Sequence, residues 1–454
     1  LYHIPNPIET VAFYFLYATL IAISKSFLLF SFSFFISWSI SPLYFRLPFV
    51  LLRFFATKKS RKGYSFRRFF YAEFCLSFST KFVFGKGEEN NVGSYLHPYT
   101  PQKVLVVYGG RSAERSGLLG RVYASLKQAG LPYVSLSGVQ PNPRYELAQE
   151  GIALCKCEQV DFVLAIGGGS VIDTAKCIAA GALYDGDPWK DFFIDKKTAQ
   201  AALPVACILT IAAAGSEGSW DAVITHEAQG LKEMMRSEAI RPVLSILNPE
   251  LTMSLPAYQT ACGVTDMFVH ITERYFTNTR DVDITDELAE ALMRTILKYG
   301  IVCVKEPDNY NARAQIMWAG TLAHNDLCGV DREQDWASHH IQHRIGAKYD
   351  SAHGAGLATI FPAWAQYVYK HDVPRFVRFA TKVMGVDNDV FHPEEVVLEG
   401  IARVKAYMSS IGLPTTKEEL GVKEEDIPQL ANIQCGGFVP LGQKEIMEIY
   451  QLMV

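Results

Sequence analysis

The sequence predicts an α/β N-terminal domain with a parallel sheet, followed by an all-α C-terminal domain. Short β-branched runs alternate with helical patterns after about residue 100, two of these runs end in glycine turns, and long helical patterns dominate after Pro256. At about 150 residues per domain, the 454 residues suggest two or three domains. We expect a hydrophobic extension at 1–70, the α/β domain at 71–255 and the helical domain at 256–454.

The α/β prediction rests on three strands and the helices between them. Apolar runs at 103–108, 133–136 and 160–166 read as strands, and the last is almost continuously apolar. A helical pattern follows at 113–130, and the turn at 141–144 opens a second helix. Strands that alternate with helices indicate a parallel sheet covered on both faces.

A glycine-rich turn is the sharpest local feature of this region. Gly167, Gly168, Gly169 and Ser170 follow the third predicted strand and lead into a helix, where Ser170 and Asp173 have the spacing of a capping box. Glycines let a phosphate approach the backbone, and the positive end of a helix dipole favours an anion. The alternative is a tight strand-to-helix turn without a ligand, because glycine turns are common.

A second glycine turn, at Gly109 and Gly110, ends the first predicted strand. Two such turns at the carboxyl ends of parallel strands can face one crevice, which favours a dinucleotide-binding domain. No carboxylate follows this turn to hold a free ribose 2′-hydroxyl, whereas Arg111, Ser112 and Arg115 suit a 2′-phosphate. The pattern therefore favours NADP(H) over NAD(H), with a solvated helix start as the alternative.

The helical half carries two groups of side chains with the spacing of metal ligands. Asp266 and His270 lie at i and i+4 on a helix predicted from Ala257 to about Thr277, and apolar neighbours turn the pair toward the interior. A buried, unpaired carboxylate is costly, and a metal ion would satisfy it.

The second group places four of the chain's eleven histidines within fifteen residues: His339, His340, His343 and His353. One carboxylate with two or three imidazoles suits Fe(II) or Zn(II) with a position left for substrate. The alternative is a set of surface or core histidines. The sequence lacks HExxH, which disfavours a zinc peptidase of that class.

Residues 1–70 differ from the rest of the chain. Phe, Ser, Leu and Ile dominate, Ser26 to Phe45 is uncharged, and a basic cluster follows at 58–68. The segment could be a membrane anchor, a targeting segment, or an extension outside the working protein. We favour the third interpretation, because the first Met is Met234.

Composition excludes several other classes of protein. The net charge of −4 provides no basic field, so we expect no nucleic-acid partner. The nine cysteines are scattered and form no CxxC pair, which fits a reducing cytoplasm rather than a disulfide scaffold.

Taken together, these motifs resemble the iron-containing (group III) alcohol dehydrogenases, and within them the butanol dehydrogenase-like, NADPH-dependent aldehyde reductases. The resemblance covers about four-fifths of the chain, from Phe82 to the C-terminus. Its pieces are Tyr108-Gly-Gly, Pro141-Asn-Pro-Arg144, Gly167 to Lys176, Gly215-Ser-Glu217, Asp266-x3-His270, Gln334 to His339 and Gly436-Gly-Phe438.

The resemblance implies roles for individual residues. The implied metal ligands are Asp266, His270, His339 and His353, with His343 near the metal but usually not a ligand. The implied cofactor-binding residues are Gly109, Gly110, Ser112, Gly167, Gly168, Gly169, Ser170 and Thr210, to which we add Asp173 in the helix after the glycine-rich turn.

The activity implied is hydride transfer between NADP(H) and a primary alcohol or aldehyde such as butanol or butanal, with His343 as a proton relay. The alternatives are a related polyol dehydrogenase, a sugar-phosphate synthase, or a membrane-tethered homologue without activity. A small aldehyde or alcohol is the expected partner, and the resemblance suggests a homodimer.

Overall fold

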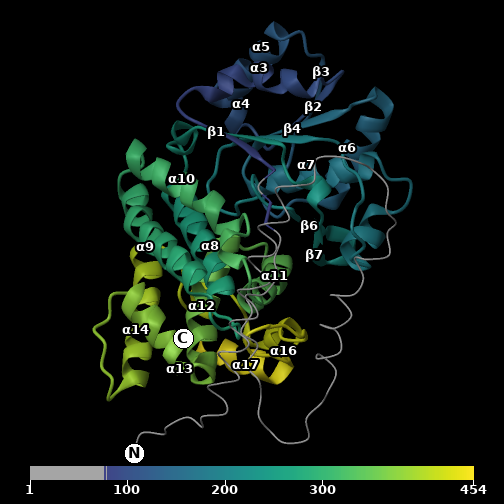
Figure 1. Cartoon of the computed structure of the whole chain (residues 1–454). Helices are drawn as coiled ribbons and strands as arrows, with labels where there is room; N and C mark the ends of the chain where they lie inside the picture. Colours follow the sequence, from purple (N-terminus) through teal and green to yellow (C-terminus); the bar gives the residue numbers. More distant parts are fainter. Residues whose placement is uncertain (1–75, 78) are drawn as a thin grey trace, which may run out of the picture. The chain divides into compact units, whose positions relative to one another are not determined.

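The computed structural model describes residues 76, 77 and 79–454 (Figure 1). It confirms the predicted fold class, because a parallel sheet with helices occupies the first half of this range and helices build the second. The predicted extension at 1–70 lies outside the described residues, so its three interpretations stay predictions. The described residues form one compact unit by their contacts, and the boundary at 255 stays a prediction.

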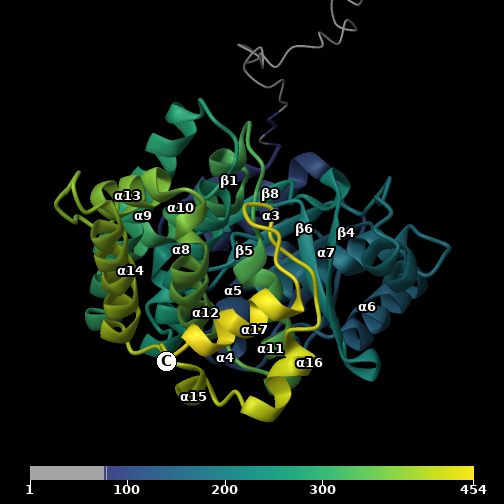
Figure 2. The same ribbon diagram turned by 90° about the horizontal axis from the view of Figure 1, so that it is seen from below.

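Six parallel strands form the central sheet in the order β1-β8-β5-β4-β2-β3. Figure 2 labels β1, β8, β5 and β4 of this sheet. The strands are β1 (Lys81–Phe84), β2 (Val104–Tyr108), β3 (Tyr133–Leu136), β4 (Phe162–Gly167), β5 (Val205–Leu209) and β8 (Leu244–Leu247). Every residue of β4, β5 and β8 is buried, as a sheet covered on both faces requires.

The register brings the ends of three strands to one edge of the sheet. Tyr108 of β2 pairs with Ile166 of β4, and Gly167 pairs with Leu209 of β5. The turns that follow these strands, at Gly109, Gly168 and Thr210, therefore lie side by side. This confirms the expectation that the two glycine turns meet at one edge.

Helices α3 (Val92–Leu96), α4 (Ser112–Arg115), α5 (Leu118–Gln128), α6 (Tyr145–Glu158) and α7 (Gly169–Ala182) belong to this half. The single helix predicted over 113–130 is wrong: Gly117 adopts φ 74° between α4 and α5 and separates them. Strand β1 was also not predicted. The glycine-rich turn consequently follows the fourth strand rather than the third.

A two-stranded antiparallel hairpin, β6 (Asp221–His226) and β7 (Leu231–Arg236), projects from the α/β half. Strand β7 contacts α11 of the helical half. The hairpin therefore joins the two halves near their boundary.

The helical half packs around one apolar core. Its main helices are α8 (Ala257–Tyr275), α9 (Asp283–Lys305), α10 (Tyr310–His324), α11 (Ala337–Tyr349), α12 (His353–Val368), α13 (Val373–Lys382), α14 (Pro393–Ser410) and α17 (Gln443–Leu452), with short α15 (Lys417–Leu420) and α16 (Ile427–Leu430). Helix α8 ends two residues earlier than predicted. Fifteen of its nineteen residues are buried, so it runs through the interior.

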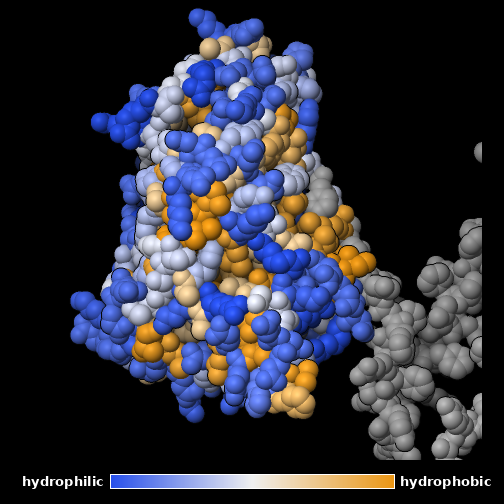
Figure 3. Space-filling view, turned by 90° about the vertical axis from the view of Figure 1, so that its left-hand side faces the viewer, coloured by the Kyte–Doolittle hydropathy of each residue, from blue (hydrophilic) through white to orange (hydrophobic). Residues whose placement is uncertain are grey.

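The outer surface of the helical half is mixed in character. Apolar patches lie separately among hydrophilic side chains on the face that Figure 3 shows, and exposed apolar residues include Ile284 and Leu288 of α9 and Leu398 of α14. Within residues 76, 77 and 79–454, every helix is too short or too polar to cross a bilayer.

Candidate active site

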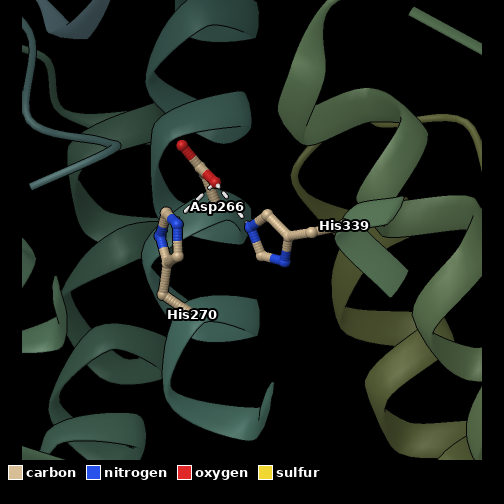
Figure 4. A group of neighbouring side chains, drawn as sticks. All are labelled: Asp266, His270 and His339. Atoms are coloured by element: carbon tan, nitrogen blue, oxygen red, sulfur yellow. Dashed lines mark ion pairs between the residues drawn. The ribbon is translucent and has the colours of Figure 1, made fainter. Parts of the chain in front are cut away.

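Three of the predicted metal ligands meet between α8 and α11. Figure 4 shows the side chains of Asp266 and His270, from α8, turned toward that of His339 on α11. Oδ1 of Asp266 lies 3.5 Å from Nδ1 of His270 and 3.7 Å from Nε2 of His339. One potential ligand atom from each residue lies within 4.8 Å of the other two.

His353, the fourth predicted ligand, approaches from the first residue of α12. Its Nε2 lies 3.5 Å from the same Asp266 Oδ1. Its other ring nitrogen, Nδ1, hydrogen-bonds the side-chain oxygen of Gln342. Three imidazoles thus surround one carboxylate oxygen of Asp266, and we name these four side chains, which come from three helices, the ligand group.

The ligand group fits a divalent metal. Asp266 Oδ1, His270 Nδ1 and His339 Nε2 are buried and have no hydrogen-bond partner among the described residues. Leaving three such atoms unsatisfied is costly, and a cation between them would satisfy all three. One carboxylate and three imidazoles form a ligand set that Fe(II) and Zn(II) both accept.

The pKa values of the imidazoles shift in different directions. Burial lowers the pKa of both His270 and His353 well below the usual value, so these rings are neutral and have a free lone pair. Burial acts in the same direction on His339, but the carboxylates of Asp266 and Glu273 outweigh it and raise the pKa of this ring. A metal ion at His339 would therefore compete with a proton more than one at His270 or His353.

Two supporting side chains were not predicted from the sequence. Glu273 accepts hydrogen bonds from the backbone N–H and from Nδ1 of His339, both at 3.0 Å, and Gln342 holds His353. Partners of this kind fix the orientation of a ligand ring. Spacing could have indicated both, because Glu273 lies two turns after Asp266 on α8 and Gln342 lies three residues after His339 on α11.

His324 was missed as well, although it lies beside the ligand group. Its ring centre is 4.2 Å from that of His270, and its Nε2 lies 3.2 Å from Asp221 Oδ2 on β6. Arg274 contacts the other ring nitrogen at 3.2 Å. His324 thus connects the ligand group to the hairpin of the α/β half. Nothing in the local sequence pairs residues 221 and 324.

His343, the predicted relay, lies on the same helix as His339. Its half-buried ring is 5.8 Å from the ring of His353, so it borders the ligand group without joining it. Burial and the nearby Lys232 hold the pKa of His343 well below its usual value. Its role in proton transfer stays a prediction.

The glycine-rich turn requires glycine for steric reasons. A Cβ atom at Gly167 would lie 2.4 Å from Val171, and one at Gly168 or Gly169 would lie 3.0 Å from Ile211 or Ala214. Helix α7 begins at Gly169 with Gly168 as its N-cap, so the predicted capping box that began at Ser170 is wrong. Ser170 instead lies inside the first turn of the helix.

Asp173 is used within the protein. Its carboxylate accepts a hydrogen bond from Ser216 Oγ at 2.5 Å and from the backbone N–H of Val223 at 3.0 Å. Asp173 therefore anchors α7 to the segment after β5 and to the hairpin. These two hydrogen bonds, and not a capping box with Ser170, account for the carboxylate at this position.

The other predicted cofactor-binding residues surround the same edge. A Cβ at Gly109 would come within 3.8 Å of Val171 after the glycine-rich turn, and the N–H of Thr210 donates to the carbonyl of Gly167 at 3.0 Å. Gly110 and Ser112 are exposed at the start of α4. The structure thus brings both glycine turns together, while contact with a cofactor stays a prediction.

The segment Thr210 to Ala214 connects this edge to the ligand group. Ile211 borders Gly168, and a Cβ at Gly263 of α8 would lie 2.3 Å from the carbonyl oxygen of Ala212. Gly263 is three residues before Asp266. The first metal ligand on α8 therefore lies about one helical turn from the segment Thr210 to Ala214, which borders the glycine-rich turn.

Lys232 of β7 is a further charged residue that sequence analysis missed. Its Nζ donates to Asn142 Oδ1 at 2.9 Å. Burial lowers the pKa of Lys232 to about 8, although the charges of Asp266 and Asp173 act to raise it. Those two aspartates belong to the ligand group and to α7, so the ammonium group is electrostatically coupled to both.

Comparisons with known proteins agree with this arrangement. Residues 79–249 match the family model described as iron-containing alcohol dehydrogenase, and residues 260–453 match the C-terminal model of the Fe-containing alcohol dehydrogenase family. The chain therefore belongs to the iron-containing alcohol dehydrogenase family, and it is an oxidoreductase of the alcohol dehydrogenase and aldehyde reductase class. The resemblance and the enzyme class predicted from the sequence are confirmed.

Three similar proteins of this family illustrate the comparison. NADH-dependent butanol dehydrogenase A of Clostridium acetobutylicum is 37% identical over 83% of this chain and 98% of its own. NADPH-dependent aldehyde reductase YqhD of Escherichia coli is 35% identical over 82% and 95%. The crystal structure of NADH-dependent butanol dehydrogenase A from Thermotoga maritima superimposes with a TM-score of 0.81 at 38% identity, covering 84% and 98% of the two chains.

Proposed function

We propose that this protein reduces small aldehydes such as butanal to primary alcohols, reversibly, with NADP(H) as the dinucleotide and Fe(II) or Zn(II) as the metal. The ligand group supports this proposal most directly, because Asp266 Oδ1, His270 Nδ1 and His339 Nε2 converge, are buried and have no hydrogen-bond partner among the described residues. The names of the relatives support the substrate class.

Each part of the site has a task in this reaction. A bound metal ion would supply Lewis-acid stabilisation of the aldehyde oxygen, and the reduced nicotinamide would supply the hydride. Asp266, His270, His339 and His353 would hold the ion, while Glu273 and Gln342 fix two of the rings. We assign the pyrophosphate of the dinucleotide to the glycine turns, at the start of α7.

The chain's other residues handle charge and protons. Lys232 places a positive charge between the ligand group and α7, where the phosphates of a dinucleotide would neutralise it. We assign proton delivery to His343, because its half-buried ring borders His353. We further propose a cytoplasmic homodimer, on the family resemblance alone.

The dinucleotide preference rests on the turn after β2. Arg111 and Ser112 are exposed there beside Gly110, where they can reach a 2′-phosphate. The relatives include users of NADH and of NADPH, so their names do not decide between them. We expect Arg111→Ala to weaken NADPH use by about three- to tenfold and to leave NADH use unchanged; equal losses with both dinucleotides would contradict the preference.

The test of the function is the oxidation of NADPH and NADH by metal-loaded protein with a panel of aldehydes, including butanal. We expect the highest kcat/KM with NADPH and a short straight-chain aldehyde. A preference for polyols or sugar phosphates would favour the alternative enzymes, and an inactive protein that binds metal would favour a homologue without catalytic activity.

A further inference from the structure

A histidine that does not belong to the ligand group packs directly against it. His324 ends α10, and its ring centre lies 4.2 Å from that of His270 on α8. Its side chain is only 9% exposed. Both of its ring nitrogens have partners in the protein: Nε2 lies 3.2 Å from Asp221 Oδ2, and Nδ1 lies 3.2 Å from Arg274 Nη2. His324 therefore has no free nitrogen for a metal ion, although it lies against a residue of the ligand group.

The two partners fix the tautomer and the orientation of the His324 ring. A guanidinium group can only donate a hydrogen bond, so Nδ1 must accept one from Arg274. A carboxylate can only accept, so Nε2 carries the proton and donates a hydrogen bond to Asp221. The other oxygen of Asp221 accepts a hydrogen bond from Arg236 Nε at 2.6 Å, which holds the carboxylate on both sides. Turning the ring by 180° would place carbon atoms against both of its charged neighbours, so a single orientation satisfies them.

Arg274 extends this contact to the backbone of the same ligand. Its Nη1 donates to the carbonyl of His270 at 2.7 Å, while its Nη2 faces His324. The Arg274 side chain is 1% exposed, and its guanidinium lies over the ring of Trp336 at 4.6 Å. His270 is thus held twice, by its ring against His324 and by its carbonyl through Arg274.

The position of His324 is itself fixed from the α/β half. Asp221 begins β6, and its backbone carbonyl accepts a hydrogen bond from Lys176 Nζ on α7 at 2.8 Å. A Cβ at Gly215 would lie 2.6 Å from the Cβ of His324, so the segment after β5 packs closely against the end of α10. A continuous series of contacts therefore joins α7, which follows the glycine-rich turn, to His270 of the ligand group.

We propose that His324 and Asp221 are positioning residues for the metal ion, which hold the ring of His270 in the orientation that binds it. This inference rests on the proposed function, since it requires a metal ion in the ligand group. His324 acts directly on His270, and Asp221 acts through His324. The two residues should therefore not affect metal affinity independently.

A double-mutant cycle on metal affinity tests the proposal. Metal-free protein is titrated with Co(II) in competition with a chelator, and the visible absorption of the bound ion reports both affinity and ligand geometry. His324→Phe keeps a ring against His270 but removes both nitrogens, and Asp221→Asn keeps the size but removes the charge. We expect His324→Phe to weaken Co(II) binding by about tenfold and to shift the absorption spectrum. We expect Asp221→Asn to weaken binding by about three- to tenfold in the native background and by less than about twofold in the His324→Phe background.

Thr321→Val is the matched control for loss of packing at the same place. Thr321 lies three residues before His324 on α10, and its Oγ1 donates a buried hydrogen bond to Glu217 Oε1 at 2.6 Å, in the segment between β5 and β6. We expect this variant to lose thermal stability and to bind Co(II) with native affinity and spectrum. Equal losses of affinity in Thr321→Val and His324→Phe would assign the effect to packing and overturn the proposal, and so would an unchanged affinity in His324→Phe.

The remaining outcomes separate the two residues from each other and from the proposed function. Losses that multiply in the double variant would overturn the claim that Asp221 acts through His324. Should His324→Phe fail to fold, Asp221→Asn alone decides, because native Co(II) affinity and spectrum in that variant would overturn the proposal. A native protein that binds no Co(II) would instead contradict the ligand group and with it the proposed function.

Discussion

The ligand group and the glycine-rich turn lie close together but are built in opposite ways. The ligand group consists of side chains on three helices, and three of their polar atoms are buried without a hydrogen-bond partner among the described residues. The turn consists of backbone: a Cβ at Gly167 would collide with Val171, and one at Gly168 or Gly169 would crowd Ile211 or Ala214. Truncating one side chain should therefore disrupt the ligand group, whereas adding one Cβ should disrupt the turn.

The largest effect should come from removing a ligand. We expect His339→Ala to lower kcat/KM for butanal by more than about a hundredfold, because the metal loses a ligand and Asp266 a buried partner. His340→Ala is the matched control, since His340 is exposed on the same helix and outside the ligand group. Equal activity of the two variants would contradict the ligand group.

A supporting residue should matter less than a ligand. Glu273→Gln keeps an acceptor for His339 but loses its charge, so we expect metal affinity to fall by about ten- to a hundredfold. Competition with a chelator measures this loss in the purified protein. An unchanged affinity would show that Glu273 only stabilises the fold.

On the backbone side, two glycines make a matched pair. Gly167→Ala forces a Cβ to within 2.4 Å of Val171, so we expect a loss of about 1–3 kcal/mol in the free energy of unfolding. Gly110 has nothing within 4 Å of its missing Cβ, so Gly110→Ala should leave stability unchanged. Urea unfolding compares them, and equal losses would refute the steric account of the turn.

The smallest expected effect is the pH dependence of NADPH binding. The Lys232 pKa of about 8 reflects burial opposed by Asp266, Asp173 and Asp350 and assisted by Arg144. Below this pKa the ammonium is charged and attracts the dinucleotide phosphates, and above it the charge is lost. The dissociation constant for NADPH should therefore rise by about three- to tenfold from pH 7 to pH 9. Lys232→Met should abolish this rise, and a persistent rise would assign it to another group.

The sequence predicted those parts of the site whose residues lie close together along the chain. The i, i+4 spacing on α8 placed Asp266 and His270 together, and the strand-glycine-helix pattern placed the turn. The contacts of His324 with Asp221 and of Lys232 with Asn142 join residues about a hundred positions apart, and no local period encodes them. Only tertiary packing reveals such pairs.

The secondary structure was likewise predicted only where the local pattern is clear. The apolar runs of β2, β3 and β4 were recognised within two residues, because buried strands leave a clear pattern. Strand β1 was missed, because it has four residues at the sheet edge and two of them are exposed. The break between α4 and α5 depends on one left-handed glycine within an otherwise helical pattern.

The most direct test of the central claim is metal analysis of anaerobically purified protein. The account predicts a stoichiometric divalent metal, iron or zinc, in the native chain, and its loss in both Asp266→Ala and His339→Ala while His340→Ala retains it. Full metal content in both ligand variants would contradict the claim that these side chains hold one ion.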